Sequence, residues 1–269
     1  MATVREIYDF LDQKAPFSLQ MDFDNAGFLV GHGEGAVTRI VVALDITEAV
    51  AEEAARVGAQ LIVSNHPVIF HPVRRLTDDD LTGRLLLSLT ERGIAAICAH
   101  TNLDVAEGGV NDALARSLEL EDAVPFQSDG LGRVGLVSGP HTASLSAFAS
   151  FVKERLGAGG VRCVDAGRPV RRVAVGGGAC GDLVLAAAEA GCDTFITSDV
   201  KYNQFLDAAA AGINLIDAGH YPTENVVCPV LAHWLRQGFP EVEVLPSQAH
   251  REVFFYQLAR PGVENPAFL

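Results

Sequence analysis

Two segments of the chain resemble each other closely enough to limit the folds it can adopt. They begin at Arg39 and Arg172, align without gaps, and match at Gly58 and Gly191. Each is typical of a strand, a turn, a helix that ends at a glycine, and a second strand. Alternation of this kind produces parallel sheets with right-handed crossovers. The alternative is that any two such units share the spacing of their elements.

The likeness continues beyond these segments. His66 and Asp199 fall opposite each other at the end of the second strand of each unit. One element later come H-T-N-L-D at 100–104 and H-Y-P-T-E at 220–224, so each unit ends in a histidine, three residues and an acid. A gapless segment followed by the same polar tail favours an internal duplication. We therefore expect an α/β fold made of two similar α/β domains.

The division of the chain follows from this repeat. Residues 120–132 have the acidic, proline and glycine content of a linker. The first domain is expected over 1–125, completed by the C-terminal segment 223–269, and the second over 126–222. Hydrophobic residues make up 49% of the chain and aromatic residues only 7%, which suits parallel strands buried on both faces.

Apolar runs and helical periodicities predict the individual elements. Strands are predicted near 39–44, 61–64, 94–98, 133–138, 172–176, 194–197 and 213–216. Helices are predicted near 4–13, 47–57, 79–92, 109–118, 144–155, 181–190, 202–210 and 223–236. The segments V-E-V-L at 242–245 and V-F-F-Y-Q-L at 253–258 are typical of further strands.

The acidic balance narrows the range of partners. With 34 acidic and 20 basic residues the formal charge is −14 and the isoelectric point about 4.9, so nucleic acid and membranes are poor partners. A small phosphorylated molecule is still compatible, because metal ions supply positive charge locally. No secretory leader opens the sequence, and no apolar run approaches the ~18 residues that span a bilayer. Five scattered cysteines without C-x-x-C spacing favour a cytoplasmic location.

Polar side chains follow two strands of the first unit. Ligands of open parallel sheets bind beyond the carboxyl ends of the strands. His66 directly follows one predicted strand, where it can ligate a divalent metal or merely cap a neighbouring loop. His100 and Asp104 follow the next strand, and a carboxylate there suits a divalent metal. The alternative for Asp104 is to cap the helix predicted to begin near Gly109.

The second unit places similar groups. His220 and Glu224 are four residues apart, as in metal sites on one helix face. Pro222 predicts that the helix begins only there, with His220 on the preceding turn, and a glutamate at a helix start also fits the helix dipole without any metal. Asp199 and Lys201 at a strand end can bind substrate or orient a metal ligand, or form a surface ion pair.

The glycine-rich stretch at 176–181 joins a predicted strand to a helix. Amides around Gly177 and Gly178 at a helix start can hold a phosphate, although a tight turn explains the glycines equally well. The stretch is neither a dinucleotide fingerprint nor a P-loop. The sequence also has no G-x-S-x-G elbow and no cysteine in an evident nucleophile setting.

Taken together, the motifs resemble those of the NIF3-like family, whose members are commonly described as GTP cyclohydrolase 1 type 2 homologues. The resemblance rests on motifs that occur in the family's order and span nearly the whole chain: D-F-D-N-A-G-F-L-V-G at 22–31, S-N-H-P-V-I-F at 64–70, H-T-N-L-D at 100–104, G-G-G-A-C-G at 176–181, S-D-V-K-Y at 198–202 and G-H-Y-P-T-E at 219–224. The family implies two similar α/β domains, a two-metal site in the cleft between them, and a ring-shaped homohexamer.

Carried over to this chain, the family's metal ligands match His66, Asp104, His220 and Glu224. The family usually has His-His-Pro where this chain has Asn65 before His66 and a proline. An amide oxygen is a weaker ligand than imidazole for a borderline metal. Asn65 is therefore expected to hold a second ion loosely, differently or not at all.

Three functions are compatible with these features. The first is a hydrolase of a nucleotide or related phosphorylated small molecule that uses up to two zinc, iron or manganese ions, with Asp199, His100 or Glu224 moving protons and with Lys201, Gly177 and Gly178 holding substrate. The second is a non-catalytic, ring-forming protein that handles metal or regulates a partner. The third is a nucleotide-binding module that uses the 176–181 loop without metal.

Overall fold

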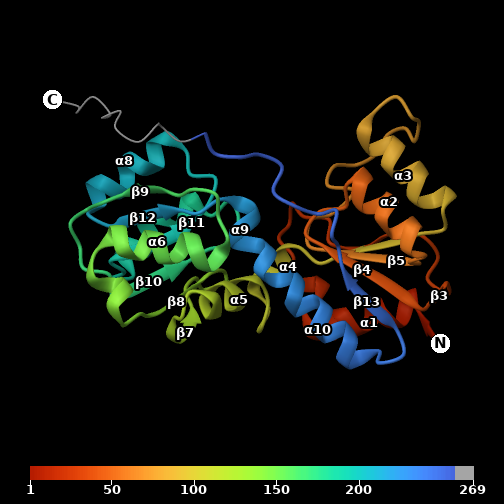
Figure 1. Ribbon diagram of the computed structural model, residues 1–269, viewed down its shortest axis with the longest axis horizontal. Coiled ribbons are helices and arrows are strands. Elements are labelled where there is room, and N and C mark those ends of the chain that lie inside the picture. The colour runs from red at the N-terminus through yellow and green to blue at the C-terminus, as the bar shows by residue number, and fades with distance from the viewer. Residues whose placement is uncertain (258–269) are drawn as a thin grey trace.

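The computed structural model describes residues 1–257 and shows two lobes, each built around one sheet (Figure 1). The first sheet has the order β13-β4-β5-β6-β2. Its strands are β2 (Gly27–Val30), β4 (Arg39–Ala43), β5 (Leu61–Ser64), β6 (Ala95–Cys98) and β13 (Glu243–Pro246). β13, β4, β5 and β6 are parallel, whereas β2 is antiparallel to β6. A short antiparallel pair lies beside this sheet, β1 (Ala2–Thr3) and β3 (Ala36–Val37).

The second sheet has the order β7-β8-β10-β11-β12-β9. β10, β11 and β12 are parallel, and β8 and β9 flank them in antiparallel orientation. Its strands are β7 (Glu121–Pro125), β8 (Arg133–Leu136), β9 (Arg162–Val164), β10 (Arg172–Val175), β11 (Thr194–Thr197) and β12 (Asn214–Asp217).

Three parallel strands therefore form the centre of each sheet, and an antiparallel strand that precedes them in the sequence borders the third. β2 occupies this place beside β6, and β9 occupies it beside β12. The gapless sequence match pairs β4 with β10 and β5 with β11. The α/β fold class is confirmed, and this topology is consistent with duplication.

Helices cover the faces of both sheets. The α-helices are α1 (Val4–Lys14), α2 (Glu48–Val57), α3 (Leu81–Glu91), α4 (Thr101–Val105), α5 (Val110–Ser117), α6 (Leu145–Leu156), α7 (Val184–Glu189), α8 (Tyr202–Ala211), α9 (His220–Glu224) and α10 (Cys228–Gly238). The 3-10 turns are η1 (Phe17–Leu19), η2 (Pro140–Ala143), η3 (Gly181–Leu183) and η4 (Asn225–Val227). Local signals set these ends: Thr47 caps α2 through its side chain, and Gly58 ends α2 in the left-handed region at φ +68°.

The parallel strands are buried on both faces, as their apolar sequences predict. In β4, Ile40 and Val42 face one hydrophobic cluster, and Val41 and Ala43 face another. This alternation follows from the two-residue period of a strand. Because apolar side chains fill both faces of these strands, polar groups can gather only at the strand ends.

The linker predicted over 120–132 is wrong in part. Residues 121–125 form β7, which pairs with β8 at the edge of the second sheet. Its side chains are all exposed, so no buried alternation revealed the strand. The division into domains at residue 125 stays a prediction.

Two expectations near the C-terminus also differ from the structure. The V-E-V-L segment forms β13, but residues 253–257 form no strand, and residue 258 lies outside the described residues. The helix predicted over 223–236 consists of α9, η4 and α10, and α9 begins at His220 instead of Pro222. Gly219 precedes α9 with φ +88°, a conformation that glycine adopts without strain. It starts the helix two residues early.

Within residues 1–257, no helix combines the length and apolar character that crossing a membrane requires.

Candidate metal centre

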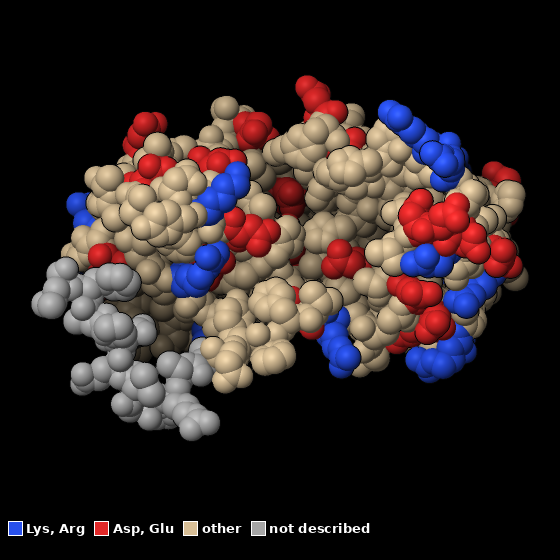
Figure 2. Space-filling view, turned by 90° about the horizontal axis from the view of Figure 1, so that it is seen from above, with Lys and Arg blue, Asp and Glu red and all other residues tan. Residues whose placement is uncertain are grey.

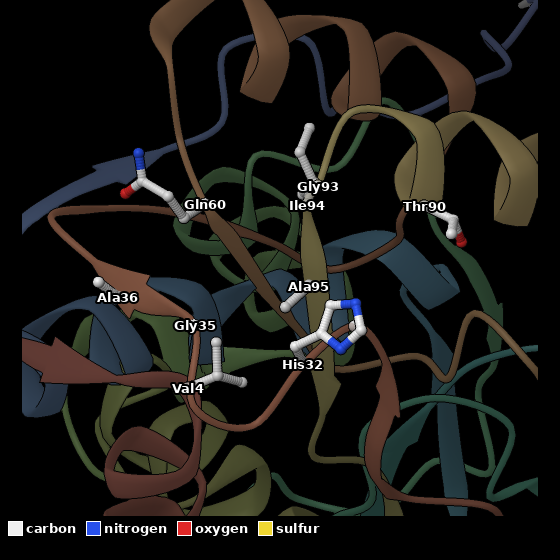
Figure 3. Close-up of a pocket in the computed structure, with 10 residues that line it drawn as sticks. Val4, His32, Gly35, Ala36, Gln60, Thr90, Gly93, Ile94 and Ala95 are labelled. Atoms are coloured by element: carbon white, nitrogen blue, oxygen red, sulfur yellow. The ribbon is translucent and has the colours of Figure 1, made fainter.

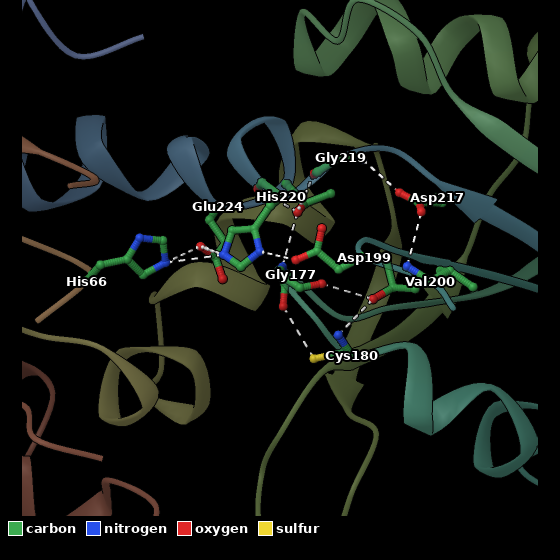
Figure 4. Close-up of polar contacts among 12 residues, drawn as sticks. His66, Gly177, Cys180, Asp199, Val200, Asp217, Gly219, His220 and Glu224 are labelled. Atoms are coloured by element: carbon green, nitrogen blue, oxygen red, sulfur yellow. Dashed lines mark hydrogen bonds and ion pairs between the residues drawn. The ribbon is translucent and has the colours of Figure 1, made fainter. Parts of the chain in front are cut away.

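Three side chains from the two lobes converge at one point. His66 follows β5 of the first sheet, whereas His220 and Glu224 are the first and last residues of α9, after β12 of the second. Glu224 Oε2 lies 2.8 Å from His66 Nε2 and 2.9 Å from His220 Nε2. These ligand atoms lie within 4.8 Å of one another, and Figure 4 shows the two imidazoles on either side of the carboxylate. Two imidazoles and a carboxylate are a donor set for a divalent transition metal.

Each of these histidines is held through its other ring nitrogen. His66 Nδ1 lies 2.7 Å from Asp45 Oδ1, and His220 Nδ1 lies 2.7 Å from Asp199 Oδ2. A carboxylate at Nδ1 fixes the ring and directs Nε2 to the metal, as it does in many metalloproteins. The distances therefore support a ligand role for both histidines.

The pKa values of His66, His220 and Glu224 are strongly shifted by the charges of their neighbours. Burial would lower the pKa of His66, but Asp45 and Glu224 outweigh it and raise that pKa to about 10. Burial opposes a high pKa at His220 too, yet Glu224 and Asp199 raise it to about 9. Burial would raise the pKa of Glu224, but the two histidines lower it to about 2. The metal-free cluster thus holds protons that a bound cation must displace.

Asp104 lies in α4, beside this cluster but outside the group of three. Its side chain is buried, and its Oδ1 has no hydrogen-bond partner among the described residues. Burial and then the nearby charge of Glu224 raise its pKa well above the usual range. The capping alternative is wrong, because Gly109 precedes α5 without any side-chain cap. A buried carboxylate oxygen without a partner fits a cation.

His100 precedes α4 and is anchored like the other two histidines. Its Nδ1 lies 2.7 Å from Asp24 Oδ1, and its ring centroid lies 5.5 Å from that of His66. Asp24 also accepts hydrogen bonds from the backbone and hydroxyl of Thr101.

These groups open into a cavity between the lobes. It has a volume of about 410 Å³ and is lined from the first lobe by residues such as Phe23, His100 and Asp104, and from the second by residues such as Cys180 and Glu224. Figure 2 shows acidic side chains recessed in the hollow between the two lobes. The hollow is large enough for a small molecule.

The glycine-rich loop after β10 lies against Glu224 of this candidate site. A Cβ at Gly178, where φ is +66°, would lie 2.0 Å from Glu224 Oε1. The amide of Gly178 donates to the hydroxyl of Thr223 at 3.1 Å, and the amide of Gly177 donates to Asn111 at 2.9 Å. Both predicted phosphate-binding amides are thus occupied within the protein, and the loop makes room for Glu224.

The other predicted residues of the second lobe lie on the loop after β11. Asp199 holds His220, as described above. Lys201 is exposed and directly precedes α8, and within residues 1–257 no ion pair joins it to Asp199. Asp217, at the end of β12, accepts from the amides of Val200 and Gly219 at 3.1 Å each and so fixes the loops before α8 and α9 (Figure 4).

Comparison of the sequence with known protein families identifies the family of this chain. Residues 2–252 match the family described as Duf34/NIF3 (NGG1p interacting factor 3). The chain belongs to this family. The resemblance inferred from the sequence motifs is confirmed.

Relatives of this Duf34/NIF3 chain match it over most of their lengths. A Clostridium perfringens protein named GTP cyclohydrolase 1 type 2 homolog is 32% identical over 259 residues, covering 93% of this chain and 98% of that protein. A Nostoc protein of the same name is 36% identical over 205 residues, covering 74% and 77%. A solved Staphylococcus aureus structure is 29% identical with a TM-score of 0.88, covering 95% and 99%. A Bacillus cereus protein related to NIF3, 23% identical with a TM-score of 0.89 and covering 96% and 99%, shares the fold.

Asn65 precedes His66 at the end of β5. Its side chain is fully buried, and neither polar atom has a hydrogen-bond partner among the described residues. A buried amide without partners costs stability unless another group satisfies it.

Three residues that hold the site escaped the sequence analysis. Asp45 lies two residues after the end of β4, so the strand-end rule that selected His66 also applies to it. Asp24 lies within a motif that supported the family resemblance, but nothing in the sequence pairs it with His100. His250 lies 3.1 Å from Asp45 Oδ2 and comes from the C-terminal segment. No sequence pattern indicates that contact.

Two other hollows lie outside the cleft. One of about 130 Å³ lies beside β3 (Figure 3), and His32 is the only titratable residue that lines it. Another, of about 830 Å³, lies on the far side of His66 and is bordered by the start of α2 and by His250. Neither gathers ligand atoms of three metal-binding residues as the cleft does.

Proposed function

We propose that this protein is a divalent-metal-dependent hydrolase of a nucleotide or related phosphorylated small molecule. The observation that carries the proposal is the convergence of His66, His220 and Glu224, of which His220 and Glu224 line a cavity between the lobes. Divalent ions bound there would lower the pKa of a coordinated water and clamp a substrate oxygen. Asp104 supplies a further unpartnered carboxylate oxygen, which suits a second ion.

The protein's own residues prepare the cavity for this chemistry. Asp45 and Asp199 hold the two imidazoles, so that their Nε2 atoms face Glu224. His100 lines the same cavity and, with Nδ1 held by Asp24, presents the group that can transfer a proton to or from a bound molecule. Asp199 touches His220 and acts in this proposal by positioning it.

The lining of the cavity supports a substrate with both a flat apolar part and negative charge. Phe23 is 64% exposed and lines the cavity, so its ring can stack on a nucleobase. Asp104, Asp182 and Glu224 repel phosphate unless cations are bound. The name of the relatives makes a guanine nucleotide the first substrate to try.

The test begins with metal content in protein purified without chelators. The proposal expects about two ions per chain in the wild type, largely lost in Glu224→Ala and retained in the exposed control Glu189→Gln. Hydrolysis of a nucleotide panel with added manganese, iron or zinc follows, with Glu224→Ala as the negative control. No hydrolysis with any of these ions would overturn the catalytic proposal.

A non-catalytic role in metal handling or regulation is the second candidate. Asn65 favours it, because replacing an imidazole by an amide weakens a site for a borderline metal. It expects metal binding that depends on Glu224 but no turnover of any substrate in the panel.

The remaining parts of the proposal concern location and assembly. We propose that the chain acts in the cytoplasm as a homohexamer of two-domain subunits, on the strength of its family membership. Light scattering during size-exclusion chromatography tests the assembly, and a monomer or dimer at micromolar concentration would contradict it.

A further inference from the structure

His100 shares the anchoring of the two histidines that face Glu224. In all three, Nδ1 lies 2.7 Å from a carboxylate oxygen, which is supplied by Asp45, Asp199 or, for His100, Asp24. A ring that donates its Nδ1 proton to a carboxylate keeps a lone pair on Nε2, as metal-bound histidines do. The first two rings use that lone pair at the site already described. In His100, too, the carboxylate at Nδ1 leaves Nε2 available to bind a metal.

Asp24 is built to hold this ring in one orientation. Its side chain is fully buried, and its second oxygen accepts a 3.0 Å hydrogen bond from the amide of Thr101 and a 2.5 Å hydrogen bond from its hydroxyl. Burial would raise the pKa of Asp24, but His100 and Thr101 lower it to about 2. The carboxylate therefore stays ionised at neutral pH.

His100 shares its cavity with carboxylate side chains. His100, Asp104 and Glu224 line the same cavity, and the ring of His100 packs edge-on to His66 with their centroids 5.5 Å apart. Asp104 Oδ1 is buried without a hydrogen-bond partner among the described residues. Asp104 lies one helical turn after His100. The amides of Leu103 and Asp104 both donate hydrogen bonds to the carbonyl oxygen of His100. A cation in this place would satisfy Asp104 Oδ1.

We propose that His100 is a ligand of a second divalent cation, which it holds together with Asp104 and Glu224. The inference rests on the proposed metal centre and adds a ligand to it, so that Nε2 of His100 binds the cation in place of the proton transfer considered above. His100 supplies to this cation the imidazole nitrogen that Asn65 cannot provide. The second site then has one nitrogen and two carboxylate donors, a set that accepts manganese, iron or zinc.

The experiment counts metal in four proteins stripped with chelator and reconstituted with Mn²⁺ alone. They are the wild type, His100→Ala, Asn65→Ala and Asp24→Asn. Metal per chain is measured after removal of free ion, and electron paramagnetic resonance distinguishes a coupled Mn²⁺ pair from an isolated ion. The unfolding temperature of each metal-free protein shows whether it folds. Should His100→Ala fail to fold, Asp24→Asn carries the test, because it keeps the ring and removes the negative charge of its anchor.

The proposal expects a coupled pair in the wild type and in Asn65→Ala. It expects a single uncoupled ion in His100→Ala and at least tenfold weaker binding of the second ion in Asp24→Asn. Two ions in His100→Ala, or loss of the second ion in Asn65→Ala alone, would overturn it. A single ion in the wild type would do the same. No ion in any of the four would instead overturn the proposed metal centre itself.

Discussion

The carboxylate of Asp199 lies 2.7 Å from Nδ1 of His220, although the two residues leave different strands of the second sheet. Asp199 adopts φ +51°, a left-handed conformation that aspartate tolerates better than most residues. The chain accepts this local strain at the residue that orients His220, a proposed metal ligand. Such strain is commonly found where a side chain must be held for function.

Replacing Asp199 by asparagine tests this relationship. Asparagine tolerates the same backbone conformation but lacks the negative charge that orients the His220 ring and increases its basicity. We expect metal affinity to fall by about 10-fold to 100-fold with little change in the unfolding temperature of the metal-free protein. Calorimetric titration with Mn²⁺ measures the affinity, and Glu189→Gln is the control for loss of one surface charge. Unchanged affinity in Asp199→Asn would contradict the role.

Gly178→Ala tests whether the glycine-rich loop makes room for Glu224. The new Cβ would lie 2.0 Å from Glu224 Oε1, so the carboxylate must move away from the histidines. Gly191→Ala is a matched control, because Gly191 also has positive φ but nothing within 4 Å of the added atom. Both variants should lose about 1 to 2 kcal/mol of stability from backbone strain. Only Gly178→Ala should also lose metal, as measured by metal content per chain.

Because the histidines bind protons in the absence of metal, the stability of the metal-free protein and its affinity for metal should change in opposite directions as the pH rises. The pKa values of His66 and His220 are raised from 6.5 to about 10 and about 9. Their contribution to the stability of the metal-free protein is therefore complete below about pH 6.5 and is lost as the pH rises through about 9 to 10. Metal binding instead strengthens over this range, because it must displace these protons.

Thermal unfolding in chelator and Mn²⁺ titration, each at about pH 6.5 and about pH 9, measure these effects. The metal-free wild type should lose more stability between the two values than His66→Ala does. The affinity for Mn²⁺ should rise over the same interval. Affinity independent of pH would show that the histidines bind no proton that the metal displaces.

Replacing Glu53 should strongly lower the stability of the protein, although this residue does not line the cavity. Its buried carboxylate accepts hydrogen bonds from the amides of Gln248 and Ala249 and from the hydroxyl of Ser247. Glu53→Ala should cost about 2 to 4 kcal/mol, because it leaves these donors unpaired. It should also expose the C-terminal segment to limited proteolysis. Glu52→Ala, on the exposed face of the same helix, should change neither.

The parallel strands and the groups at their ends could be predicted from the sequence because each depends on local order. The apolar runs before His66 and before His220 mark strands by their own composition and length. The same holds for the helix caps at Thr47 and Gly58. These features need only the period of a strand or helix and the chemistry of a single turn.

The partners of the histidines could not be predicted in this way. Asp24 meets His100 across 76 residues and His250 meets Asp45 across 205, so only the packing of distant segments brings them together. The exposed strand β7 was missed because no buried face marks it. The early start of α9 depends on the positive φ of Gly219. A proline two residues later was the stronger local signal, and it was misleading.

The pairing of β13 with β4 has a consequence for the nascent chain. β4 lies near the beginning of the sequence, but the strand beside it spans residues 243–246. One edge of the first sheet therefore remains unpaired on the ribosome until the chain has been synthesised through residue 246. An open edge of this kind attracts foreign strands. We expect the first lobe to depend on chaperones, or on the speed of translation, more than the second lobe, whose six strands lie within residues 121–217.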